Sequence, residues 1–163
     1  MPNIFGSKVV IRTMTEKDLS KVASVFTEAY DKADIGERWT YDASYSLINY
    51  WFLKQPDLCF VAIVENKIVG GFVAGIKPWW DGNHLIDGEI FVDPAYQTCG
   101  IGPKLSKIMY QTALEKYKIT NISFITFSRN NFPLRWWRKL GFGIETHLIL
   151  IDADPKEVLK KLL

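Results

Sequence analysis

The chain has 163 residues, 48% of them hydrophobic, which is the usual size of one domain with a full core. Its 20 Lys and Arg residues against 18 Asp and Glu residues give a formal net charge of +2. So small a charge creates no strong field, which argues against a nucleic acid or an anionic membrane as partner and leaves a small neutral or cationic partner open. We therefore expect a single domain over residues 1–163.

The first third of the chain predicts one strand and two helices. Residues 9–14 are β-branched and predict a short strand, and Thr15 followed by Asp18 resembles the capping box that begins a helix. The apolar stripe of this helix comprises Leu19, Val22, Ala23, Phe26 and Tyr30. After a polar, acidic stretch, we expect Asp42 to cap a second helix that Pro56 ends.

The middle of the chain predicts three consecutive strands and a long helix. Residues 58–64 and 68–76 are rich in β-formers and are joined by three polar residues, which predicts a hairpin. Residues 84–92 predict the third strand after a turn. A helix from Gly100 to Lys118 and a strand over residues 121–128 then predict a right-handed parallel crossover.

The last third predicts a short helix over residues 133–140 ended by Gly141, a strand over 142–151, and a terminal helix begun by Asp154-Pro155. The predicted order is β-α-α-β-β-β-α-β-α-β plus that helix. The predicted fold class is α/β: a mixed, mostly antiparallel sheet of about six strands with helices on both faces.

A glycine-containing stretch lies where the long helix begins: Gln97-Thr98-Cys99-Gly100-Ile101-Gly102. A helix N-terminus presents unpaired N–H groups that bind phosphate, and glycines permit its close approach. Two glycines alone suit a tight strand-to-helix turn equally well. The chain lacks Gly-Lys-Ser/Thr, which a Walker loop requires, and Leu105 stands where a dinucleotide fingerprint wants its third glycine.

Residues 92–102, Val-Asp-Pro-Ala-Tyr-Gln-Thr-Cys-Gly-Ile-Gly, resemble the core motif of the GNAT superfamily of N-acetyltransferases, Val-x-Pro-x-Tyr-Arg/Gln-x-x-Gly-x-Gly/Ala. Asn130 and residues 137–142, Trp-Arg-Lys-Leu-Gly-Phe, resemble its second signature, Asn…Tyr-Glu-Lys-Leu-Gly-Phe. The order of elements agrees over nearly the whole chain. The resemblance implies an acetyltransferase that uses acetyl-CoA and no metal.

The resemblance also implies which residues bind coenzyme A. Backbone exposed between two splayed strands would hold the pantetheine arm, and the loop before the long helix would hold the pyrophosphate. The implied set is Ile90, Phe91, Val92, Gln97, Thr98, Cys99, Gly100, Ile101, Gly102, Asn130 and Trp137. Trp137 stands where the family often has a tyrosine that protonates the leaving thiolate, so Tyr96, water or unaided departure remain open.

Attack on a thioester needs a neutral amine, and an alkylamine is mostly protonated at pH 7, so a carboxylate must accept a proton. Glu89 lies three residues before Val92, where the family often carries a general base that acts through water. We expect that role for Glu89. Asp87 lies on the same face of an alternating strand, and the alternative for both residues is a solvated position. Asp87 is otherwise a substrate contact.

The two segments that build the acceptor site in this family are rich in acids and aromatics here, which suits a cationic amine. The expected substrate-binding residues are Asp31, Glu37, Trp79, Trp80 and Asp87. The predicted reaction is N-acetylation of a small cationic amine, such as a polyamine, an aminoglycoside or an amino acid derivative. The alternatives are a protein N-terminal or lysine acetyltransferase and a non-catalytic acyl-CoA-binding module.

Cys59 and Cys99 either form one disulfide or remain free, and we expect free thiols in a reducing cytoplasm. The N-terminus lacks a signal-peptide pattern, and no apolar run approaches membrane-spanning length. We therefore expect a cytoplasmic protein without nucleic acid or membrane partners. Exposed sheet edges and the family resemblance suggest a homodimer.

Overall fold

The computed structural model describes residues 8–128 and 131–162, with the side chains of residues 87 and 131–133 left out. The chain divides into two compact units, Met1–Ile125 and Thr126–Leu163. The expected single-domain organisation over residues 1–163 stays a prediction.

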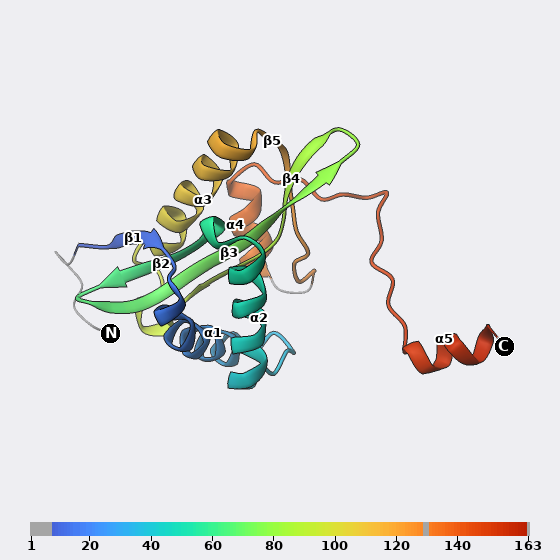
Figure 1. Cartoon of the computed structure of the whole chain (residues 1–163), viewed down its shortest axis with the longest axis horizontal. Coiled ribbons are helices and arrows are strands. Elements are labelled where there is room, and N and C mark those ends of the chain that lie inside the picture. The colour runs from blue at the N-terminus through green and yellow to red at the C-terminus, as the bar shows by residue number, and fades with distance from the viewer. Residues whose placement is uncertain (1–7, 129–130, 163) are drawn as a thin grey trace. The chain divides into compact units, whose positions relative to one another are not determined.

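A five-stranded sheet is the centre of the first unit, and its strands follow one another in chain order (Figure 1). The first four strands pair antiparallel, whereas the last two pair parallel. This confirms the mixed, mostly antiparallel sheet and the parallel crossover. The strands are β1 (Val10–Thr13), β2 (Cys59–Val64), β3 (Lys67–Trp79), β4 (Gly82–Val92) and β5 (Ile119–Ser123).

Helices cover both faces of this sheet, as the sequence predicts. They are α1 (Leu19–Ala33) and α2 (Tyr41–Lys54) on one face and α3 (Ile101–Tyr117) on the other (Figure 1). Because both faces are covered, β2 alternates between two cores: Val61 packs with α1 and α2, and Phe60 packs with α3. The strand therefore reads as a continuous apolar run.

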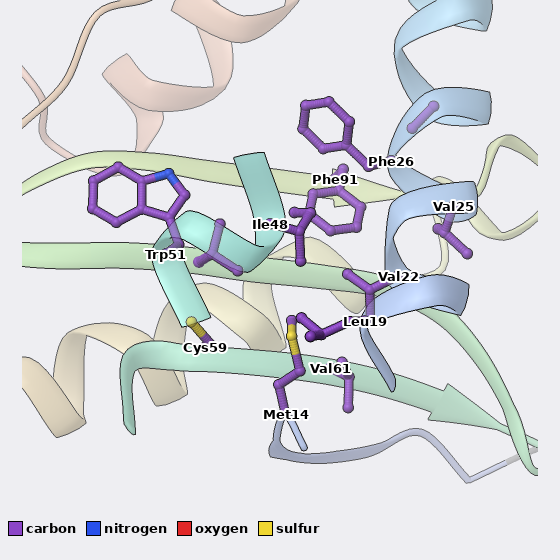
Figure 2. Packing of buried hydrophobic residues seen from close by; sticks show 12 residues of the cluster. Met14, Leu19, Val22, Val25, Phe26, Ile48, Trp51, Cys59, Val61 and Phe91 are labelled. Carbon is purple, nitrogen blue, oxygen red and sulfur yellow. The ribbon is translucent and has the colours of Figure 1, made fainter. Parts of the chain in front are cut away.

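The core under α1 and α2 contains an aromatic contact that reaches β4. Phe26 of α1 is fully buried and meets Phe91 of β4 edge to face, with ring centroids 5.1 Å apart (Figure 2). Ile48 and Trp51 of α2 pack in the same cluster. Burial of this kind contributes about 1.5–3 kcal/mol per large apolar side chain, and it holds α1 over β4.

The two predicted caps have different outcomes. The contact between Thr15 and Asp18 is present: the Thr15 N–H donates to Asp18 Oδ2 at 2.8 Å, within a 3₁₀ turn that runs into α1. The cap at Asp42 is wrong, because α2 begins earlier. Thr40 Oγ1 accepts from the Ala43 N–H at 3.2 Å, and Asp42 lies inside the first turn.

The hairpin of β3 and β4 is longer than predicted. The strands stay paired as far as Trp79 and Gly82, so the turn expected before residue 84 shrinks to Trp80-Asp81. Conversely, β5 ends at Ser123, although strand character was expected as far as residue 128.

The second unit contains two helices, α4 (Asn131–Lys139) and α5 (Pro155–Lys161). Gly141 adopts φ +94° and the Phe142 N–H bonds back to the Trp137 carbonyl at 3.1 Å, which confirms the predicted left-handed end of α4. The strand predicted over residues 142–151 is absent. Its pattern suits a strand, but these residues are not paired with the sheet of the described chain, and a strand forms only with a partner.

Candidate active site

Strands β4 and β5 separate partway along β4. Their pairing runs from Asn83 with Ile119 to Ile86 with Ser123 and stops there. Further along, Glu89 to Val92 remain paired with β3 on the other side only, within the described residues. Beyond Ile86, sheet pairing therefore no longer occupies the backbone groups of β4 that point away from β3, and such groups bond water, a side chain or a ligand.

A β-bulge lies at the point of separation. Gly75 pairs with Ile86 and Val73 pairs with Glu89, so β4 has one residue more than β3 between these pairs. Gly88 sits in the bulge, and a Cβ there would lie 2.7 Å from a ring carbon of Phe72. Only glycine allows this approach.

Glu89 and Phe91 face α1 and α2, whereas Ile90 and Val92 pack in the core under α3. This alternation follows from the two-residue period of a strand. It leaves the carboxylate of Glu89 on the face opposite α3, next to the end of α1.

The loop between β4 and α3 is shaped by left-handed residues. Thr98 has φ +65° and Gly100, the residue before the helix, has φ +75° and ψ 12°. A Cβ at Gly100 would meet no atom within 4 Å. No acid lies in the first turn of α3, and no side chain of the described residues caps its start, so its N–H groups and positive dipole end are left to bind a ligand.

Two side-chain bonds support this loop. Gln97 Nε2 donates to the Val92 carbonyl at 3.2 Å, which ties the loop to the end of β4. Cys99 Sγ donates to the Gln97 carbonyl at 3.3 Å. Both cysteines are free thiols, as expected. Burial of Cys59, followed by the nearby charge of Asp57, raises the pKa of its thiol to about 12.

Tyr30 of α1 reaches Glu89: its hydroxyl donates a hydrogen bond to Glu89 Oε2. The Tyr30 ring stacks on Phe26 with ring centroids 4.3 Å apart, and the Trp39 ring meets it edge to face with centroids 6.0 Å apart. Burial, followed by the charges of Glu89 and Glu37, raises the pKa of Tyr30 far above its usual value.

The sequence placed Tyr30 in an apolar stripe and among the aromatic residues of the acceptor segment, but it predicted no contact between Tyr30 and Glu89. The four-residue spacing from Phe26 indicates a shared helix face, but it contains no signal for a partner 59 residues away.

Glu37 and Trp39 lie on the segment between α1 and α2. The Trp39 Nε1–H donates to Glu37 Oε2 at 2.8 Å, and Trp39 also packs against the core under α1. Glu37 is exposed yet near enough to act on the Tyr30 hydroxyl electrostatically. The structure therefore brings one predicted acceptor residue, Glu37, close to Tyr30 and Glu89. Asp31 is also exposed, at the end of α1.

Trp79 and Trp80 lie elsewhere, at the tip of the β3–β4 hairpin. Trp80 is 89% exposed, and Trp79 lies under Lys77 Nζ at 4.2 Å. Glu89 lies seven positions along the strand from Gly82, roughly 23 Å at about 3.3 Å per residue. The tip of this hairpin is therefore far from the Glu89 carboxylate.

Three predicted residues are not placed with these. Trp137 belongs to the second unit, where it is 8% exposed and contacts Trp136 and Phe142. Asn130 and the side chain of Asp87 lie outside the described residues.

In the part of the chain that is described, no cluster of three His, Cys, Asp or Glu side chains could hold a metal ion. None of its helices is both long and apolar enough to span a membrane.

A family model described as the acetyltransferase (GNAT) family matches residues 20–142. The chain is 30% identical over 102 residues to a spermine/spermidine N(1)-acetyltransferase of Bacillus subtilis strain 168, which is 60% of this chain and 64% of that protein. The match thus spans less than two thirds of that relative.

Two solved structures show the same fold. The crystal structure of PH1933 from Pyrococcus horikoshii OT3 has a TM-score of 0.71 at 25% identity, covering 86% of this chain and 92% of that one. The aminoglycoside N-acetyltransferase AAC(6')-Iy, solved in complex with CoA, has a TM-score of 0.68 at 20% identity, covering 94% and 98%.

Proposed function

The chain belongs to the GNAT family of acetyltransferases, and on this premise we propose that it transfers the acetyl group of acetyl-CoA to a primary amine. We propose further that the acceptor is a small cationic amine: a polyamine, an aminoglycoside or an amino acid derivative. The observation that carries the proposal is the position of Glu89, at the point where β4 separates from β5 and on the face that α1 covers.

The residues present fit acetyl-CoA. Gly100 has a left-handed backbone with open space beside it, and the first turn of α3 has neither an acid nor a side-chain cap. Such a helix start binds a pyrophosphate. The backbone of Ile90, Phe91 and Val92 lies beyond the end of the β5 pairing, and this stretch suits the amide groups of a pantetheine arm, which would lie along it like a neighbouring strand. When bound, acetyl-CoA supplies an acetyl group activated as a thioester.

Glu89 is the proposed general base. A primary alkylamine has a pKa of about 10.4 and arrives as an ammonium ion, which cannot attack the thioester. The Glu89 carboxylate accepts the excess proton through a water molecule, and a backbone N–H of β4 stabilises the negative charge on the carbonyl oxygen. Trp137 carries no proton acidic enough for the leaving thiolate. That proton comes from Tyr96 or water, or the thiolate leaves unaided.

The acceptor class is supported by the charge near Glu89. Glu37 and the Trp39 indole lie on the segment after α1, close to Tyr30 and Glu89. An acid beside an aromatic face binds an ammonium group through Coulomb and cation–π attraction. The Bacillus relative is named as a spermine and spermidine acetyltransferase, which agrees with this class.

A panel of amines tests the proposal. With acetyl-CoA present, we expect release of coenzyme A with spermidine, an aminoglycoside or a basic amino acid derivative. Glu89→Gln should lower kcat/KM at pH 7 by 10²–10⁴-fold, the usual contribution of a positioned base, while acetyl-CoA affinity measured by calorimetry stays within twofold. Tight acetyl-CoA binding without coenzyme A release for any amine would overturn the proposal.

The same measurements separate the alternatives. An acyl-CoA-binding module binds acetyl-CoA without turnover, and Glu89→Gln then has no rate to change. A protein acetyltransferase releases coenzyme A with N-terminal or lysine peptides and not with small amines. We also propose a cytoplasmic location, which the two free thiols support, and a homodimer.

A further inference from the structure

The hydrogen bond from Tyr30 to Glu89 joins two elements that are far apart in the chain. Tyr30 lies in the last turn of α1, and Glu89 is the first β4 residue paired with β3 beyond the bulge. Tyr30 donates its hydroxyl proton to Glu89 Oε2. The proposed base therefore has its carboxylate oriented by a residue from another element.

The Tyr30 ring is held by aromatic neighbours. It stacks on Phe26 with ring centroids 4.3 Å apart and planes 24° apart. The Trp39 ring packs against it edge to face, with centroids 6.0 Å apart. Phe26 is itself fixed because it is completely buried and packs against Phe91. The hydroxyl is thus presented to Glu89 from a rigid stack, and little freedom is lost when it makes the bond.

The chemistry of the pair assigns the roles. Burial, Glu89 and Glu37 raise the pKa of Tyr30 far above its usual value, so the phenol stays protonated at any pH used in an assay. A phenol that remains protonated donates to a carboxylate and cannot itself act as the base. Donation to the charged form favours ionisation of the carboxyl group, so it keeps Glu89 ready to accept a proton.

Besides Glu89, one described ionisable group acts on Tyr30. Glu37 acts on Tyr30 from the segment after α1, and on α2 Lys54 lies over the Tyr50 and Trp51 rings. The residue opposite Glu89 on β3 is Val73, which cannot ionise.

We propose that Tyr30 is the positioning residue of the reaction: its hydrogen bond orients the Glu89 carboxylate toward the acceptor amine. This rests on the proposed function, in which Glu89 accepts the proton of the amine. In this role Tyr30 acts on the reaction through its hydrogen bond to Glu89.

The test is Tyr30→Phe, which keeps the ring and its stacking and removes only the hydroxyl. With one amine throughout, we expect kcat/KM at pH 7 to fall about tenfold and the acidic limb of its pH profile to move up by about one unit. The sign follows because loss of a donor to the charged form raises the pKa of Glu89. In a Glu89→Gln background, Tyr30→Phe should cause no further loss.

Tyr110→Phe is the matched control. Tyr110 lies on α3 under the opposite face of the sheet, and burial raises the pKa of its hydroxyl to about 12. The substitution removes a buried phenol hydroxyl in the same way, and we expect the pH profile to stay unchanged.

A second readout does not depend on activity. Carboxyl ¹³C titration by NMR, with the Glu89 signal assigned by its loss in Glu89→Gln, should show a higher Glu89 pKa in Tyr30→Phe than in the wild type. An unchanged Glu89 pKa, or an unchanged pH profile in an active enzyme, would overturn the positioning role. A raised Glu89 pKa in a protein that acetylates no amine would support the role of Tyr30 and refute the proposed function.

Discussion

Two glycines near the site are required for different physical reasons. Gly88 has a neighbouring ring so close that any side chain would collide with Phe72. Gly100 has open space beside it but a backbone at φ +75°, where a residue with a Cβ is strained by about 1–2 kcal/mol. The first requirement is one of packing in the bulge, and the second is one of shape in the proposed pyrophosphate cradle.

Gly100→Ala tests the cradle at this scale. We expect acetyl-CoA affinity, measured by calorimetry, to fall about tenfold or more, because the methyl group occupies the open space where the phosphates would approach. The control is Gly36→Ala, since Gly36 has φ +91° and equally open space but lies between α1 and α2. An equal loss of affinity in both variants would show that backbone strain alone is responsible.

At the scale of elements, an ion pair fastens β1 to the start of α1. Arg12 Nη1 lies 2.7 Å from Asp18 Oδ2, and Nη2 lies 2.9 Å from Oδ1. Hydrogen bonds from Arg12 lower the pKa of Asp18 well below its usual value, and they outweigh the burial of the carboxylate. The pair thus fixes where α1 begins, and Tyr30 follows about three turns later on the same helix.

Asp18 makes stability depend on pH. Its pKa is lower in the folded state than in the unfolded state, so its contribution is complete above about pH 5 and is lost as the pH falls below about 4. By urea unfolding at pH 7, Asp18→Asn should cost about 1–2 kcal/mol, a discounted value because the Arg12 side chain is 40% exposed. At pH 2 the cost should be smaller.

Asp42→Asn serves as the control for this prediction. Asp42 is exposed in the first turn of α2, and we expect the wild-type free energy of unfolding within about 0.5 kcal/mol at both pH values. A cost for Asp18→Asn that is the same at pH 7 and pH 2 would contradict the assigned pKa direction.

At the scale of the whole molecule, the two units differ in how they bury apolar residues. The first unit has two cores, one on each face of its sheet. The second unit leaves four consecutive apolar residues, Leu148 to Ile151, between 68% and 84% exposed. An exposed apolar run of strand-forming residues favours pairing with another chain, which is the observation that supports a homodimer.

Sedimentation velocity over a range of concentrations tests the homodimer. We expect a species of about twice the 18.7 kDa chain mass at micromolar concentration. Ile149→Lys combined with Ile151→Lys should produce monomers, because these alternate positions are 84% and 81% exposed. Leu53→Lys on α2, at a position 73% exposed, should leave the dimer intact. If the wild type is a monomer at every concentration, the homodimer is excluded.

Local signals in the sequence were sufficient for most of the fold. The two-residue period of the strands, the apolar stripe of α1 and the glycine at the end of α4 each act within a few residues, so they can be read along the chain. The same holds for residues 92–102, whose contiguous motif indicated the family. Local signals gave a wrong prediction at two places. At Asp42 the competing cap of Thr40 decided where α2 begins, and over residues 142–151 a strand partner was missing.

The arrangement around Glu89 could be decided only by the tertiary structure. The family resemblance singled out Glu89 as a carboxylate on β4, but the sequence could not show that Tyr30 donates to it or that Trp79 and Trp80 lie at a distant hairpin tip. These facts depend on the register of β3 against β4 and on the packing of α1. Such contacts join residues dozens of positions apart, and their energies come from packing that no local pattern contains.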